Sequence, residues 1–238
     1  DYQPSRGLGD VYKRQASRTI PFVSKALGIP LARIAARVMA GKSLKELNFE
    51  GVPNIKGFCV KEAVMPFNKF QNVDPILGPE MRSTGEVMGI GDTFAEAFEK
   101  AEVAAGVEIP KTGSVFISVR DTDKQFLSEI IPSLDQEGFK LIATKGTANV
   151  IKDMGYKVMQ IKKVLEGRPN IIDLMKNKEV NLVINTTEGR ESIQDSASIR
   201  RTALDQKICC TTTIQGAKAI CEVLSKKVDW SYQKLQDN

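Results

Sequence analysis

The sequence predicts an α/β protein in which a mostly parallel sheet, covered by helices on both faces, follows a smaller α+β piece. From Ser114 onward, short apolar runs alternate with amphipathic segments, and short connections join them. Repeated β-α units of this kind give parallel strands, because each helix returns the chain across one face of the sheet. Before about Gly106 the predicted helices and strands do not alternate, which indicates a separate α+β piece.

Composition narrows the classes of partner and chemistry. The 238 residues carry a formal net charge of +5 with basic and acidic residues interspersed, so no nucleic-acid partner is expected. No apolar stretch reaches the roughly 20 residues of a membrane span, and no signal peptide is visible. We therefore expect a cytoplasmic protein with no membrane partner. Because there is no histidine and the cysteines lack metal-ligand spacing, we expect reduced cysteines, no imidazole catalysis and no metal site.

The first part of the chain combines a stretch without periodicity with a clear amphipathic helix. Residues 1–15 match neither a helix nor a strand, and we expect them to be non-native sequence. On that expectation, the native frame begins near Ala16, inside a longer protein. Residues 30–40 are predicted to form a helix ended by Gly41, because their apolar residues share one face (Leu31, Ile34, Ala35 and Val38).

A hairpin and a second helix complete the α+β piece. Strands are predicted over residues 58–66 and 83–89, separated by a loop rich in Gly, Pro and Asp. Thr93 and Glu96 have the spacing of a capping box, which predicts a helix from Thr93 to near Gly106. Two helices and a hairpin bury little apolar surface, which is typical of a domain without its N-terminal part.

The alternating pattern belongs to residues 107–238. Strands are predicted over residues 114–119, 139–144, 157–161, 180–185 and 208–211. Helices are predicted over residues 123–136, 146–154, 170–176, 190–204 and 214–225. Ligands of such sheets bind beyond the carboxyl ends of the strands, so the residues that follow these strands are the candidates for a site.

The turn after the second of these strands has the composition of a phosphate site. Gly146 stands between Thr144 and Thr147, directly before a predicted helix. A helix N-terminus offers unpaired N–H groups and the positive end of the helix dipole, and the Thr hydroxyls add donors. For an isolated Thr-x-x-Thr, however, simple helix capping is the commoner role.

Residues at the other strand ends favour the phosphate site. Lys124 follows the first strand and Lys163 follows the third. Asn185 and Thr187 follow the fourth, and parallel strands bring all of these residues to the same edge as the turn. Either lysine alone would more often be a solvated surface residue. Together, the cations, hydroxyls and amide favour a ligand that joins a phosphate to a hydroxylated or amide-bearing group, such as a nucleoside.

Several runs before Gly106 carry a family signature, at residues 16–26, 38–44, 61–70 and, most specifically, 77–89. They resemble the end of the second synthetase half in the carbamoyl-phosphate synthase large-subunit family. This resemblance implies that residues 16–106 are the C-terminal remnant of an ATP-grasp domain. In that family the half uses ATP with Mg or Mn to phosphorylate carbamate. Its metal-binding residues lie upstream of the matched runs, so we expect no ATP or metal cofactor in this chain. Arg18 matches an Arg that faces the phosphorylated intermediate, which implies a catalytic remnant.

A second set of runs, at residues 117–124, 143–148, 163–171, 183–190 and 199–204, is similar to the C-terminal regulatory domain of the same family. That domain has the methylglyoxal-synthase-like fold, and the resemblance implies that residues 107–238 form an allosteric domain. In bacterial members it binds UMP and inosine monophosphate. The residues that match the phosphate and ribose positions are Lys124, Thr144, Thr147, Lys163, Asn185 and Thr187.

The resemblance also implies the remnant of an ornithine site. Some bacterial members bind this activator between the two domains, and Glu62 and Thr212 match residues of that site. Thr211 replaces the Asp that would pair with the ornithine ammonium. An amine without that carboxylate loses a charge-assisted partner, so we expect weak or absent activation by ornithine.

The resemblance implies a parent enzyme that is an ATP-dependent ligase. It makes carbamoyl phosphate from bicarbonate, glutamine-derived ammonia and two ATP for pyrimidine and arginine biosynthesis, with a glutaminase small subunit and the rest of the large subunit as partners. The chain alone is expected to be inactive. A stand-alone methylglyoxal synthase and a purine-cyclohydrolase-like domain share the fold and are the alternatives. The segment before Gly106 argues against both, and the absence of histidine argues against the first.

Overall fold

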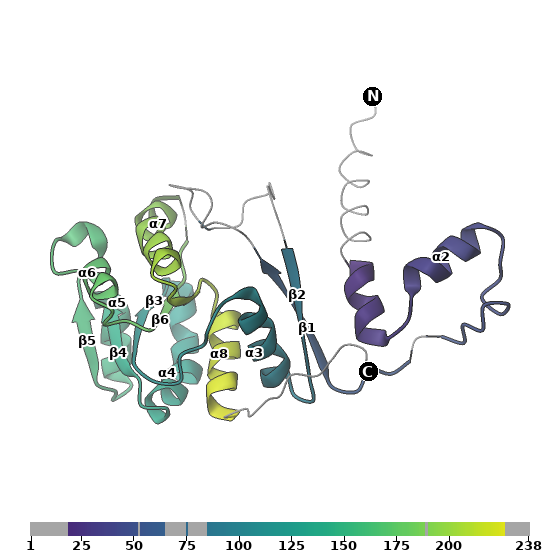
Figure 1. Cartoon of the computed structure of the whole chain (residues 1–238). Helices are drawn as coiled ribbons and strands as arrows, with labels where there is room; N and C mark the ends of the chain where they lie inside the picture. The colour runs from purple at the N-terminus through teal and green to yellow at the C-terminus, as the bar shows by residue number, and fades with distance from the viewer. Residues whose placement is uncertain (1–18, 52, 65–74, 76–84, 189, 227–238) are drawn as a thin grey trace.

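The C-terminal part of the chain forms a parallel sheet, and an antiparallel hairpin precedes it (Figure 1). The computed structural model describes residues 19–51, 53–64, 75, 85–188 and 190–226. Within these residues the larger sheet has five strands in the order β5-β4-β3-β6-β7, and every neighbouring pair is parallel. The predicted mostly parallel sheet is confirmed.

Strand β3 lies at the centre of this sheet. It spans Ser114–Ser118, and its neighbours are β4 (Lys140–Thr144) and β6 (Leu182–Asn185). The outer strands are β5 (Val158–Ile161) and β7 (Cys209–Thr211). The chain runs outward from β3 through β4 to β5, then crosses to β6 on the other side of β3. This reversal makes a topological switch point, where the carboxyl ends of β3, β4 and β6 leave a crevice for a ligand.

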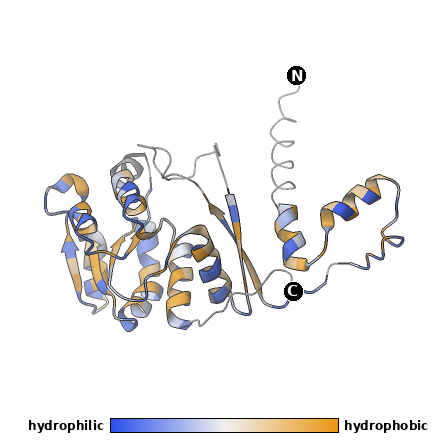
Figure 2. Ribbon diagram, in the orientation of Figure 1, coloured by the Kyte–Doolittle hydropathy of each residue, from blue (hydrophilic) through white to orange (hydrophobic). Residues whose placement is uncertain are grey.

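Helices cover both faces of the sheet, as predicted. Helices α4 (Leu127–Gln136), α5 (Lys145–Asp153) and α8 (Ile214–Lys226) contribute to the larger of two buried clusters. Helices α6 (Ile171–Lys176) and α7 (Arg190–Asp205) contribute to the other. Because successive side chains of a strand point to opposite faces, Val115 and Ile117 lie in the first cluster and Phe116 in the second. Hydrophobic residues accordingly concentrate on the strands and on α8 (Figure 2).

The segment that follows β3 differs from the prediction. A helix was expected from residue 123, but residues Asp121–Phe126 form the 3₁₀ turn η2, and α4 begins only at Leu127. The Asp123 carboxylate accepts a hydrogen bond from Arg120 Nε at 2.8 Å. That contact spans three residues, and it therefore suits a helix with three residues per turn.

The hairpin and helix α3 form a small layered unit. Strands β1 (Phe58–Val64) and β2 (Gly85–Gly91) pair antiparallel, and α3 (Phe94–Ala105) packs on them. Gly89 is required for this packing, because a side chain there would overlap the backbone of α3 at Ala97. The predicted capping box is half correct. Thr93 Oγ1 accepts from the Glu96 N–H at 3.3 Å, but the Glu96 carboxylate accepts from the Asp92 N–H instead.

The first described helices stand apart from the sheet (Figure 1). Helix α2 (Leu31–Met39) forms where predicted, and no residue of it is buried within the described part of the chain. Among the described helices, no single one is both long and apolar enough to cross a membrane. Residues Thr19–Leu27 and Leu31–Met39 meet the length and composition only as a pair, bent by 113°.

Candidate functional site

A cavity of about 700 Å³ opens beyond the carboxyl ends of β3, β4 and β6. Its wall is built by these strand ends, by the turns η2 and η3 (Val164–Glu166), and by residues of α5, α6 and α7. All six residues predicted to bind phosphate or ribose line it: Lys124, Thr144, Thr147, Lys163, Asn185 and Thr187. The structure therefore brings the six predicted residues to one place, at the switch point of the sheet.

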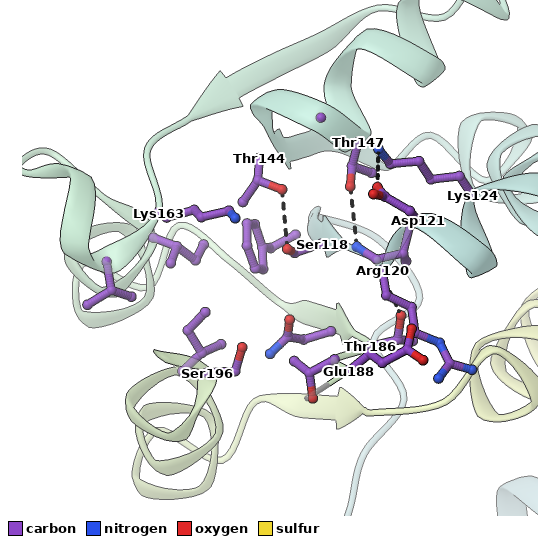
Figure 3. Close-up of a pocket in the computed structure, with 18 of the residues that line it drawn as sticks. Ser118, Arg120, Asp121, Lys124, Thr144, Thr147, Lys163, Thr186, Glu188 and Ser196 are labelled. Atoms are coloured by element: carbon purple, nitrogen blue, oxygen red, sulfur yellow. Dashed lines mark hydrogen bonds and ion pairs between the residues drawn. The ribbon is translucent and has the colours of Figure 1, made fainter. Parts of the chain in front are cut away.

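The Thr144 and Thr147 hydroxyls face strand β3 rather than their own helix (Figure 3). Thr144 is the N-cap residue of α5, yet its side chain makes no capping hydrogen bond. Its Oγ1 lies 3.2 Å from Ser118 Oγ, and Thr147 Oγ1 accepts from the Val119 N–H at 3.2 Å. The capping role is therefore wrong for these hydroxyls, and the first N–H groups of α5 have no side-chain cap.

The two lysines of the cavity reach it from different turns (Figure 3). Lys124, in η2, is partly buried, and a Cβ placed on Gly146 would lie 3.3 Å from its Nζ. The ammonium group therefore lies against the first turn of α5, where glycine leaves room for it. Lys163 precedes η3 and is exposed, and its backbone N–H donates to Glu166 Oε2 at 2.9 Å. Positive charge thus lies at the same helix end that attracts anions.

Asn185 presents an unsatisfied donor to the cavity. Its side chain is 2% exposed, and its Nδ2 has no hydrogen-bond partner within the described residues. Leaving a buried amide unpaired costs about 1–3 kcal/mol, so such groups are usually satisfied. A ligand with an acceptor at this point would remove that cost.

Part of the cavity wall is apolar. It is formed by Phe116, Val164, Leu165, Ile171 and Ile199. Leu165 is 78% exposed. A ligand that carries a flat, weakly polar ring would cover this wall while its polar groups meet the lysines and hydroxyls.

The sequence analysis did not identify several residues that line the cavity. Ser118, Asp121 and Ser196 line the cavity, and Ser118 contacts Thr144 directly. Ser118 ends strand β3, so the strand-end rule already pointed to it. Asp121 precedes Lys124 by three residues, and that spacing also signals a contact in a tight turn.

The predicted ornithine residues lie outside this cavity. Neither Glu62 nor Thr212 lines it, and Arg18 lies outside the described residues. Burial raises the pKa of Glu62, which sits on β1 opposite Val87. Sequence reasoning missed its neighbour Glu102 on α3. Burial first, and the Glu62 charge second, raise the pKa of Glu102 to about 7.

Comparison with known proteins relates the chain to two groups. Residues 127–212 match the family model of the MGS-like domain. Over 225 residues the chain is 58% identical to the carbamoyl phosphate synthase large chain of Pseudomonas syringae pv. tomato. The aligned region covers 94% of this chain and 21% of that protein. The large chain of Pasteurella multocida is 54% identical over 224 residues, with the same two shares. The chain thus spans about a fifth of the length of these curated relatives.

Among solved structures, methylglyoxal synthase from Elizabethkingia anophelis NUHP1 matches with a TM-score of 0.40 and 18% identity. The match covers 48% of this chain and 79% of that one. The MGS-like match includes the lining residues from Thr144 onward, whereas those at the end of β3 and in η2, Lys124 among them, precede it. The chain therefore contains an MGS-like domain and, over 94% of its length, is similar to the C-terminal region of the carbamoyl phosphate synthase large chain.

Proposed function

We propose that this chain is part of a carbamoyl phosphate synthase large chain and that its cavity binds a regulatory nucleoside monophosphate. Similarity at 51–58% identity to large chains supports the parentage. The observation that carries the ligand proposal is the convergence of two lysines, two buried threonine hydroxyls and a helix N-terminus in one cavity. Such a set matches the charge and the acceptor oxygens of a phosphate.

The phosphate is assigned to the first turn of α5. Lys124 and Lys163 supply charge, and the Thr147 hydroxyl can donate to a phosphate oxygen while it accepts from the Val119 N–H. The Thr144 hydroxyl, beside Ser118 Oγ, is a second possible donor. The uncapped N–H groups of α5 complete the cradle. Charge-assisted hydrogen bonds are the strongest available to a surface site, so this group supplies most of the affinity.

The nucleoside is assigned to the remaining walls. The Asn185 amide and the Thr187 hydroxyl, at the end of β6, suit ribose hydroxyls. The apolar wall that includes Val164 and Ile199 suits the base. UMP and inosine monophosphate are the proposed effectors.

The whole protein is proposed to be a cytoplasmic ATP-dependent ligase that makes carbamoyl phosphate for pyrimidine and arginine biosynthesis. It would use bicarbonate, two ATP and ammonia released from glutamine by a small subunit. Within the described residues, no group of three or more Cys, Asp or Glu side chains is arranged to hold a metal ion. We propose that ATP and its Mg or Mn bind the rest of the large chain, and that this chain regulates rather than catalyses.

Regulation requires that the effector bind one arrangement of the large chain more tightly than another. We propose that nucleotide at the α5 turn favours one packing of the MGS-like domain against the synthetase half and so changes its affinity for ATP. Helix α8 offers a contact route, because α4 and α3 both pack against it and α3 carries the hairpin.

Calorimetric titration of the 238-residue chain with UMP tests the cavity directly. Lys163→Ala removes a cavity charge, and we expect affinity to fall about 10- to 100-fold. Lys162→Ala is the matched control, because Lys162 is an exposed neighbour that bonds to the Arg168 carbonyl and does not line the cavity. Equal affinities in both variants and the wild type would refute the nucleotide site. Formation of methylglyoxal from dihydroxyacetone phosphate would refute the regulatory assignment.

A further inference from the structure

A carboxylate already occupies the cationic side of the cavity. Asp121 Oδ1 lies 2.7 Å from Lys124 Nζ, and Figure 3 marks this ion pair. The hydrogen bond and the charge of Lys124 lower the pKa of Asp121, and the charge of Lys163 adds to the effect. Both lysines that line the cavity therefore act on the same carboxylate.

Packing does not hold Asp121 in place. Its side chain is 92% exposed, so it can rotate into water without losing buried contacts. Asp123, two residues on, is the opposite case. Its side chain is 8% exposed and accepts from Arg120 Nε at 2.8 Å, which makes it part of the η2 turn. Of these two acidic residues, only Asp121 is free to leave its partner.

A phosphate would compete with Asp121 for the same cation. The Lys124 ammonium lies against Gly146 in the first turn of α5, which is the position assigned to the phosphate. A phosphate there and a carboxylate 2.7 Å from that ammonium would repel each other across a few ångströms. One of the two anions must therefore move when the other binds, and the exposed side chain is the mobile one.

We propose that Asp121 is a built-in counter-ion of the cavity, which neutralises Lys124 while no phosphate is bound and swings into water when one binds. The inference rests on the proposed nucleotide site and adds a residue that tunes its specificity. A dianionic phosphate gains more from two lysines than a single carboxylate does, so it displaces Asp121. A ligand with only one carboxylate gains little by the exchange, so Asp121 favours phosphates over carboxylates.

The Asp121→Asn variant distinguishes a counter-ion to Lys124 from a residue that positions Lys124. We would titrate the 238-residue chain with UMP, inorganic phosphate and uridine by calorimetry. The displacement model expects UMP and phosphate to bind about 3- to 10-fold more tightly to the variant, because no anion has to be displaced. Uridine, which lacks the phosphate, should bind as it does to the wild type.

Glu222→Gln is the matched control. It removes one negative charge and one exposed lysine ion pair, Glu222 with Lys226 at 2.9 Å, on helix α8 and away from the cavity. We expect it to change UMP affinity less than about 2-fold, because charges beyond the Debye length are screened. An equal gain in both variants would mean a general charge effect and would overturn the counter-ion role.

The remaining outcomes are also decisive. If Asp121→Asn unfolds like the wild type but binds UMP equally or more weakly, Asp121 instead positions Lys124, and the inference is wrong. If neither the wild type nor the variant binds UMP or phosphate, the proposed function fails first, and the counter-ion role fails with it. Binding by the Asp121→Asn chain alone would support the inference in its strongest form.

Discussion

Thr147 serves the fold and the cavity at once. Its hydroxyl accepts from the Val119 N–H at 3.2 Å, and its side chain is 1% exposed. A hydroxyl that accepts from the backbone still has a proton to donate, and the cavity is where that proton can go. Thr144 is placed in the same way beside Ser118. These contacts tie the start of α5 to the end of β3, so the geometry of the phosphate cradle depends on the core.

Thr147→Val keeps the shape of the side chain and removes its acceptor. We expect the free energy of unfolding to fall by about 1–3 kcal/mol, because the buried Val119 N–H loses its partner. UMP affinity should fall about 10-fold with the lost donor. Urea unfolding and calorimetry measure the two effects. Thr112→Val, at an exposed position outside the cavity, should change neither. An unchanged free energy of unfolding would mean that Val119 finds another acceptor.

Helix α5 begins without any connecting loop. Strand β4 ends at Thr144 and the helix starts at Lys145, so the first turn stands directly at the carboxyl edge of the sheet. Gly146 is a poor helix former, yet it occupies this turn. The structure gives the reason, since a side chain there would approach the Lys124 ammonium. The glycine lowers the helix propensity of the first turn of α5, but it allows the Lys124 ammonium to lie close to the N-terminus of the helix.

Gly146→Ala should therefore separate stability from binding. The free energy of unfolding should stay the same or rise by up to about 1 kcal/mol, because alanine favours the helix. UMP affinity should fall about 3- to 10-fold, because the new Cβ would lie 3.3 Å from Lys124 Nζ and displace it. A double-mutant cycle with Lys124→Met is the control, and Gly146→Ala should have no further effect on binding in that background. An equal loss in both backgrounds would contradict this cause.

The hairpin unit and the sheet meet across helices α3 and α8. Glu99 of α3 is buried and pairs with Lys111, which leads into β3. Glu102, one turn further along α3, lies close enough to Glu62 and to Cys209 of β7 for their charges to interact. Burial raises the pKa of Glu102 to about 7, so this junction changes charge near neutral pH.

The stability of the molecule should therefore depend on pH at this junction. A carboxyl whose pKa is raised by folding binds protons more tightly in the folded chain, so stability falls as pH rises from about 4.5 through about 7. The Glu102→Gln variant has no ionisable group at this position. At pH 8 its free energy of unfolding should exceed that of the wild type by about 1 kcal/mol, a value reduced for screening by solvent. At pH 4, below both pKa values, the two should be nearly equal.

Urea unfolding at pH 4, 5, 6, 7 and 8 measures this dependence. The exposed Glu108→Gln is the control, because it removes one carboxylate outside α3 and should follow the wild-type curve. Parallel curves for the wild type and Glu102→Gln would show that Glu102 does not cause the pH dependence.

Local patterns were enough to predict the parallel sheet, its helices and the six residues that meet in the cavity. The apolar runs that alternate with amphipathic segments predict where the strands lie. Because helical crossovers make the strands parallel, the carboxyl ends of all strands lie at one edge of the sheet. Lys124, Thr144, Lys163 and Asn185 follow from that rule, because it depends only on chain direction and on the order of elements.

Other features depend on contacts between distant parts of the chain, and only the folded structure decided them. The Thr147 hydroxyl accepts from the Val119 N–H, just beyond the end of β3, instead of capping its helix, and the buried Asn185 Nδ2 has no partner within the described residues. The raised pKa of Glu102 requires burial between two units and a second carboxylate from β1. Burial and long-range hydrogen bonding are properties of the packed molecule, so neighbouring residues in the sequence carry no signal for them.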